Sequence, residues 1–268
     1  MKQVGILLIV VALIAFVFSG VFSPDRSIFP VVNWVKGFFN NTSEQIRDYE
    51  ESFSNTYDTN IENISIEVVS SNVYILKDDS TSNIKVTYEG NGELRVSEGS
   101  TTLTLEEKFK KWNLGNIRKG NLEIIVPANL EDLEISSASG DIEIKDISGN
   151  TLNLDNVSGK ILLDNISYEK IDIESISGKI TIDNMGFDEG NFNNVSGSIN
   201  ANIIKAWDEF SIETISGDIE LSLAKEISPN ITFESVSGKL NSSISSTESN
   251  NCDLEINTVS GDVSVETN

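Results

Sequence analysis

A serine–glycine pair recurs along the second half of the chain, and this repeat constrains the fold more than any other feature of the sequence. The spacings between consecutive pairs are 19, 19, 19, 20, 21 and 23 residues. Seven copies at so regular an interval indicate a solenoid, in which each repeat forms one turn. The pairs are Ser139–Gly140, Ser158–Gly159, Ser177–Gly178, Ser196–Gly197, Ser216–Gly217, Ser237–Gly238 and Ser260–Gly261.

Apolar residues recur at fixed distances from each of these serines. The residues six and four positions before the serine are apolar in thirteen of fourteen cases, and Gly190 is the exception. The residue immediately before the serine is apolar in every copy, from Ala138 to Val259, as are most residues three and five positions after it. This spacing predicts a short strand that ends in a turn, with all of these residues on its buried face.

A chain that returns to the same face after each repeat stacks parallel strands about 4.8 Å apart. We therefore predict an all-β fold, a parallel β-helix (β-solenoid) with rungs of about 19 to 23 residues, preceded by an N-terminal transmembrane helix. A helical solenoid would need an apolar period of about 3.6 residues, which is absent. The hairpins of a β-sandwich would not reproduce one register seven times.

The serine and glycine of each pair are interpreted as corner residues of the rungs. Glycine permits a positive φ at the corner, and the serine hydroxyl can bond to its own turn or to the next rung. A catalytic role for the serines is disfavoured, because seven equivalent residues without a base cannot each be a nucleophile.

The N-terminus carries the only targeting signal that we identify. Residues 4–22 contain no charge and are long enough, as a helix, to nearly span a hydrocarbon core. We divide the chain into a transmembrane anchor (1–23), a juxtamembrane linker (24–60), irregular N-terminal rungs or a cap (61–132) and regular β-helix repeats (133–268). A cleaved signal peptide and a buried core helix remain alternatives for the first segment.

Positive charges near the predicted anchor are almost balanced, with Lys2 on one side and Arg26 and Lys36 on the other. We expect a single-pass cell-membrane protein with its C-terminal domain extracytoplasmic, because long polar domains are translocated largely regardless of charge. Secretion after signal cleavage is the alternative location.

Composition excludes several classes of function. The formal net charge is −23, which argues against a nucleic-acid partner. The chain has no histidine, so imidazole metal sites and Ser-His-Asp triads are excluded. We expect no cofactor and no metal, since the glycine-rich nonapeptide of calcium-binding β-rolls is missing and Asp and Asn are ordinary turn formers.

Three groups of residues could still carry chemistry. The position after each Ser–Gly pair holds mostly Asp or Lys, and ion pairs between neighbouring rungs could control register there. Acidic residues three positions before the serine form a column, interrupted by Asn193, that could serve a glycosidase or a lyase. A basic patch could contact lipid headgroups or anionic wall polymer, although a solvated loop would have the same sequence. The acidic column is Asp155, Glu174, Glu213 and Glu234, and the basic patch is Lys108, Lys110, Lys111, Trp112, Arg118 and Lys119.

The segment LEIIVPANLEDLEISSASGDIEI (122–144), followed by tandem hydrophobic-Ser-Gly-x-Ile units behind a membrane segment, resembles the bacterial "putative adhesin" family. These are β-strand-repeat proteins of the cell envelope that contain a domain of unknown function, and the resemblance covers roughly residues 61–268. It implies a non-catalytic, adhesin-like or envelope-stress-associated binding or structural module. Its partners would be the membrane, through the N-terminal helix, and wall polymer, lipid headgroups or an envelope protein. The alternative is a β-helix hydrolase or lyase that acts on acidic polysaccharide or wall polymer.

Overall fold

The computed structural model describes residues 51–57, 60–109, 118–244 and 252–268, and every described element is a β-strand. The predicted transmembrane anchor and most of the linker lie outside these residues. Within them, no helix is long and apolar enough to cross a membrane.

The strands follow one another along the chain with short connections. They are β1 (Glu51–Tyr57), β2 (Asn63–Val68), β3 (Asn72–Lys77), β4 (Ile84–Gly90), β5 (Glu93–Glu98), β6 (Thr102–Lys108), β7 (Asn121–Val126), β8 (Asp132–Ser137), β9 (Ile142–Lys145), β10 (Ser148–Ser158), β11 (Ile161–Ser177), β12 (Ile180–Ser196), β13 (Ile199–Ser216), β14 (Ile219–Leu223), β15 (Pro229–Ser235), β16 (Leu240–Ser242), β17 (Cys252–Ser260) and β18 (Val263–Thr267).

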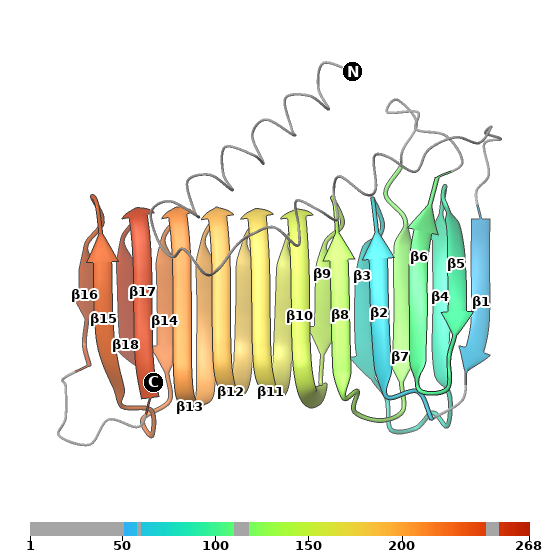
Figure 1. Ribbon diagram of the computed structural model, residues 1–268, viewed down its shortest axis with the longest axis horizontal. Coiled ribbons are helices and arrows are strands. Elements are labelled where there is room, and N and C mark those ends of the chain that lie inside the picture. The colour runs from blue at the N-terminus through green and yellow to red at the C-terminus, as the bar shows by residue number, and fades with distance from the viewer. Residues whose placement is uncertain (1–50, 58–59, 110–117, 245–251) are drawn as a thin grey trace, which may run out of the picture. The chain divides into compact units, whose positions relative to one another are not determined.

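Most of these strands stack in parallel and in register, as Figure 1 shows. On one face of the solenoid, Leu133 of β8 lies beside Leu152 of β10, which lies beside Ile171 of β11. On the other face, Ile142 of β9 lies beside Ile161, the first residue of β11. The long strands β11, β12 and β13 thus contribute to both faces. This arrangement confirms the prediction of an all-β solenoid.

The stacking order departs from the chain order near both ends of the solenoid. The pair β17 and β18 inserts between β13/β14 and β15/β16, so the last strands of the chain are not the last rung. The pair β2 and β3 likewise inserts between β6/β7 and β8/β9. Both terminal rungs of the chain therefore have a parallel neighbour on each side.

Antiparallel strands close the end of the solenoid that contains β1. Strand β5 pairs antiparallel with β6, β4 pairs antiparallel with β7, and β1 pairs antiparallel with β4. Residues between 61 and 132 thus form both parallel rungs and an antiparallel cap, which the sequence had left as alternatives.

The structure corrects the prediction for the residue immediately before each corner serine. The inward-facing residues continue the alternation from six and four positions before the serine to two positions before it, so the preceding residue points outward. Among the seven such apolar residues only Val157 is buried, and Val236 is 76% exposed. The prediction was wrong because it placed a turn before the serine, whereas strands β10 to β13 and β17 continue to the serine itself.

The one glycine among the predicted core positions makes room for an aromatic cluster. A Cβ on Gly190 would lie 2.7 Å from the ring of Phe187. That ring packs edge-on against Phe192 and Phe210, with centroid separations of 5.9 and 5.0 Å. The missing side chain of one rung is therefore replaced by a larger one from the same rung.

Candidate functional site

The corner glycines form a column in which each backbone approaches that of the next rung. A Cβ on Gly178 would lie 1.9 Å from the carbonyl oxygen of Gly159, and a Cβ on Gly159 would lie 2.1 Å from that of Gly140. These distances are far below any real contact of a Cβ. Gly178 also has a φ of 156°, which side-chain-bearing residues rarely adopt. The close approach of neighbouring rungs therefore requires glycine at this position.

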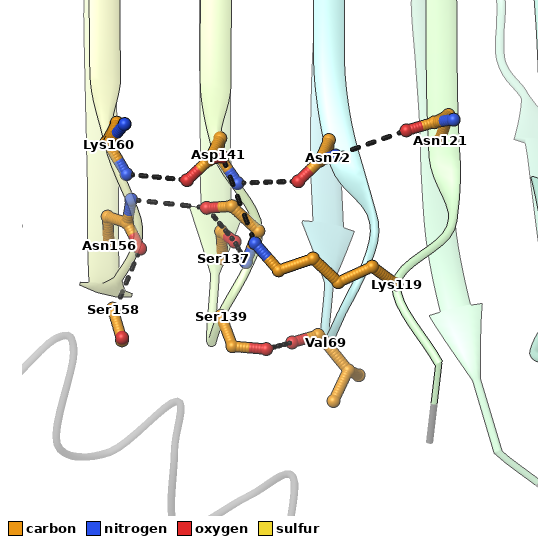
Figure 2. Close-up of polar contacts among 11 residues, drawn as sticks. Val69, Asn72, Lys119, Asn121, Ser137, Ser139, Asp141, Asn156, Ser158 and Lys160 are labelled. Carbon is orange, nitrogen blue, oxygen red and sulfur yellow. Dashed lines mark hydrogen bonds and ion pairs between the residues drawn. The ribbon is translucent and has the colours of Figure 1, made fainter. Parts of the chain in front are cut away.

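The residues that follow the Ser–Gly pairs link neighbouring rungs through the backbone, as Figure 2 shows for four successive rungs. The N–H of Lys160 donates to Asp141 Oδ1 at 2.8 Å, and the N–H of Asp141 donates to Asn72 Oδ1 at 3.0 Å. Asn72 Nδ2 in turn donates to Asn121 Oδ1 at 3.2 Å. Carboxylate and amide oxygens thus hold the register here, where ion pairs between side chains were expected.

The same ladder recurs near the other end of the solenoid. The N–H of Lys239 donates to Asp262 Oδ1 at 3.1 Å, and the N–H of Asp262 donates to Asp218 Oδ1 at 3.0 Å. Both links follow the spatial order of the rungs and not the order of the chain.

A small polar residue lies two positions before each serine; six of the seven are buried, and several bond to the corner. The Gly140 N–H donates to Ser137 Oγ at 3.0 Å, and the Ser158 N–H donates to Asn156 Oδ1 at 3.1 Å. Sequence reasoning missed this polar seam, although a Ser, Asn or Thr at the same offset in all seven repeats is a readable signal. The residues are Ser137, Asn156, Ser175, Asn194, Thr214, Ser235 and Thr258.

The corner serines themselves are exposed, and the hydroxyls of two of them bond to the neighbouring rung. Ser139 Oγ donates to the carbonyl of Val69 at 3.0 Å, and Ser237 Oγ donates to that of Val259 at 3.1 Å. These two hydroxyls thus act as structural donors between rungs.

A buried carboxylate takes the place of the glycine corner in the β2–β3 rung, where the chain has Ser70 and Ser71. Glu107 is only 1% exposed, and its Oε2 accepts the N–H groups of Val69, Ser70 and Ser71 at 2.7, 2.9 and 3.3 Å. Its Oε1 accepts the hydroxyls of Ser71 at 2.6 Å and Tyr88 at 2.9 Å. Burial and the nearby Glu107 charge raise the pKa of Tyr88, so this phenol remains a proton donor.

The predicted basic patch is an insertion between β6 and β7, and both of its ends lie beside this buried carboxylate. Ser70 Oγ donates to the carbonyl of Arg118 at 3.2 Å. Lys108 forms an ion pair with Glu106, and Lys119 Nζ lies 3.8 Å from Asp141 Oδ2. Lys110, Lys111 and Trp112 lie outside the described residues, so the convergence of the patch stays a prediction.

The acidic column follows the outward side of one solenoid face. Asp155 and Glu174 are register partners on β10 and β11, so their Cα atoms lie about 4.8 Å apart. Burial, with the charges of Asp172 and Glu134, raises the pKa of Asp155 to about 6. Burial, with the charges of Asp155 and Asp172, raises the pKa of Glu174 to about 8.

The rest of the column has a different environment on each rung. Glu213 is 8% exposed, whereas Glu234 is exposed on β15 at the end of the solenoid. Asn193 separates Glu174 from Glu213. A neighbouring pair of carboxylates with raised pKa values thus occurs at one place in the column.

A family model described as Toastrack DUF4097 matches residues 61–268, which contain every repeat and the ladders between them. The chain belongs to this family. The match confirms the resemblance to a family of unknown function that was drawn from the sequence. No curated protein matches this Toastrack chain.

Solved structures resemble the Toastrack solenoid at low sequence identity. A "putative adhesin" from Bacteroides fragilis is 14% identical, with 84% of this chain and 100% of that chain covered and a TM-score of 0.52. A "putative adhesin" from Parabacteroides distasonis is 16% identical, with 83% and 99% covered and a TM-score of 0.45. A "putative lipid binding protein" from the same species is 16% identical, with 85% and 98% covered and a TM-score of 0.44. The first of these likenesses supports the same fold.

Proposed function

We propose that this Toastrack protein is a membrane-anchored, non-catalytic binding or structural module whose solenoid lies outside the cytoplasm. The observation that carries the proposal is the corner ladder, which fixes each rung to the next through backbone and side-chain bonds. Such a body presents the same outward positions at a fixed spacing, as a rigid binding surface requires. The uncharged segment 4–22 and the names of the structural neighbours agree with a role in the cell envelope.

Limited proteolysis of intact cells tests the location. The full chain carries a C-terminal epitope tag, and protease is added before or after the cells are opened. We expect the tag to be removed from intact cells while a cytoplasmic control protein survives. Protection of the tag until the cells are opened would contradict an extracytoplasmic solenoid.

The basic insertion is the surface that we assign to ligand binding, with anionic polymer or phospholipid headgroups as the ligand class. Lys108, Lys110, Lys111, Arg118 and Lys119 bring five positive charges to a chain whose net charge is −23. Opposite charges attract such a segment to an anionic surface by about 1 kcal/mol for each residue near it. One structural neighbour is also named a "putative lipid binding protein".

A charge-reversal variant tests this assignment. Replacing Lys108, Lys110 and Lys111 with Glu should weaken binding of the detergent-solubilised full chain to anionic nanodiscs or purified cell wall by at least about tenfold. The matched control replaces three exposed lysines elsewhere, Lys160, Lys179 and Lys225, and changes the net charge equally. Equal losses for the two variants would assign the effect to net charge and not to the insertion.

A hydrolase or lyase acting on acidic polysaccharide is the second candidate, and the Asp155–Glu174 pair favours it. A carboxyl group whose pKa is about 8 is protonated at neutral pH and can donate a proton to a leaving group, while its neighbour accepts one. Turnover of uronate or wall glycans that disappears in Glu174→Gln but survives in the exposed variant Glu234→Gln would replace the binding function with this one.

A further inference from the structure

The end of the solenoid opposite β1 consists of strands that have a described partner on one side only. Strand β15 pairs with β17, and β16 pairs with β18. Figure 1 shows these two strands as the last rung of the stack. Along their outer edges the backbone donors and acceptors of a parallel sheet have no partner strand among the described residues.

Apolar residues of this last rung are less buried than their equivalents on the neighbouring rung. Ile231, Phe233 and Leu240 are half-buried, whereas their register partners Leu254, Ile256 and Val263 are at most 2% exposed. At the opposite end the antiparallel strands β4 and β5 cover the core. The described part of the chain thus caps one end of the solenoid and leaves core residues at the surface of the other.

The last rung has no net charge, which favours contact with the same rung of a second copy. Residues 229–242 contain one acidic and one basic residue, Glu234 and Lys239, and are therefore neutral within a chain whose net charge is −23. The edge strand at the opposite end, β5, contains Glu93, Arg95 and Glu98 within six residues. Charged edges of this kind discourage strand addition, whereas a neutral apolar edge permits it.

The sequence of β15, PNITFES, is self-complementary when two copies run antiparallel about Thr232. Ile231 then lies opposite Phe233 of the other copy, so core residues meet core residues. Asn230 lies opposite Glu234, so an amide donor meets a carboxylate and no like charges face each other. Residues directly opposite in an antiparallel pair share one face, which keeps the apolar pair inside and Thr232 outside.

We propose that two copies of this chain join end to end through the β15/β16 rung, with β15 antiparallel to β15 about a two-fold axis at Thr232. The contact is isologous and closes after two copies, so it makes a dimer and not a filament. The dimer adds a partner, a second copy, to the proposed function. It rests on that function only for the position of the solenoid outside the cytoplasm.

Disulfide trapping tests the contact in the full chain in detergent micelles. A Thr232→Cys variant, in a Cys252→Ala background, places two thiols opposite each other across the two-fold axis, within the range of Cα separations that a disulfide spans. The matched control is Ser97→Cys, an exposed position on the edge strand β5 at the other end. Mild oxidation should yield at least about fivefold more covalent dimer for Thr232→Cys than for Ser97→Cys.

A second variant separates the contact from any effect on folding. Thr232 is exposed, so Thr232→Lys should leave the far-ultraviolet circular dichroism and the thermal transition unchanged while opposing two positive charges at the axis. We expect the dimer dissociation constant from sedimentation to rise by about tenfold. Equal trapping at positions 97 and 232, or a chain that is monomeric at every concentration, overturns the proposal. Neither result bears on the protease test of location.

Discussion

At the residue scale, the corner glycines satisfy two constraints at once. Gly178 adopts a φ of 156°, and its Cα faces a carbonyl oxygen of the preceding rung so closely that no Cβ fits. The oxygen belongs to Gly159, in the bend between β10 and β11, and the Gly159 N–H is bonded to the carbonyl of Ser177 at 3.2 Å, so the oxygen has little freedom to move away. A substitution at a corner therefore strains two rungs, and the cost is not relieved by a different rotamer.

Gly178→Ala should lower the free energy of unfolding by about 2 to 4 kcal/mol, because the added Cβ forces two stacked rungs apart. Gly186→Ala is the control, since its Cβ would meet only the side chains of Lys205 and Ser167, at 3.3 and 3.6 Å. Urea denaturation measures both variants. Similar stabilities for the two would show that the corner does not need glycine.

The repeat allowed the corner residues to be predicted, but not which neighbours of the serine face the core. Hydrophobicity assigned the interior to the apolar residue just before each serine, of which only Val157 is buried. The interior position is instead the polar residue two before the serine, such as Asn156. The polar residue can be accommodated inside because its side-chain oxygen accepts the N–H of the corner residue Ser158.

At the element scale, the β2–β3 corner shows how a rung functions without the glycine. Ser71 stands in the glycine position, and Glu107 of β6 accepts three consecutive backbone N–H groups there. The basic insertion begins at the end of β6, the strand that carries Glu107, and the carbonyl of Arg118 at its other end accepts a bond from Ser70 Oγ. The departure from the repeat thus coincides with the place where the chain inserts an extra loop.

Glu107→Gln should destabilise the solenoid by about 2 to 4 kcal/mol, because the amide loses charge-assisted bonds and turns a donor group toward backbone donors. Glu106→Gln is the control, since its side chain is about one-third exposed and pairs only with Lys108 among the described residues. Thermal unfolding followed by circular dichroism compares the two. A larger loss for Glu106→Gln would contradict the role assigned to Glu107.

The strands of this region could be recognised from their alternation, but the Glu107 site could not. Its backbone partners lie 36 to 38 residues away in sequence and Tyr88 lies 19 away, while Glu106 beside it has the same side chain. Only the alternation of the strand, which turns Glu107 inward, distinguishes them, and a single inward carboxylate contradicts the usual hydrophobic pattern.

At the scale of the whole molecule, the sequence predicted the solenoid but not the order of its rungs. Every rung presents the same in-register pattern, so hydrophobic and hydrogen-bonding complementarity allow any rung to stack on any other. The insertion of β17 and β18 beneath the final rung is accompanied by the longest spacing of the repeat, 23 residues between Ser237 and Ser260. The chain skips one rung position between β14 and β15, and the longer segment after β16 then leads back to the gap between them.

The measurement that tests this account most directly is disulfide formation between rungs at the corner serines. Ser216 is the register partner of Ser260, so Ser216→Cys with Ser260→Cys, in a Cys252→Ala background, should form an intramolecular disulfide across about 4.8 Å. Ser216→Cys with Ser237→Cys should not, because those corners lie two rungs, about 9.6 Å, apart. Cross-linking of the second pair without the first would contradict the rung order, in which β17 lies between β13 and β15.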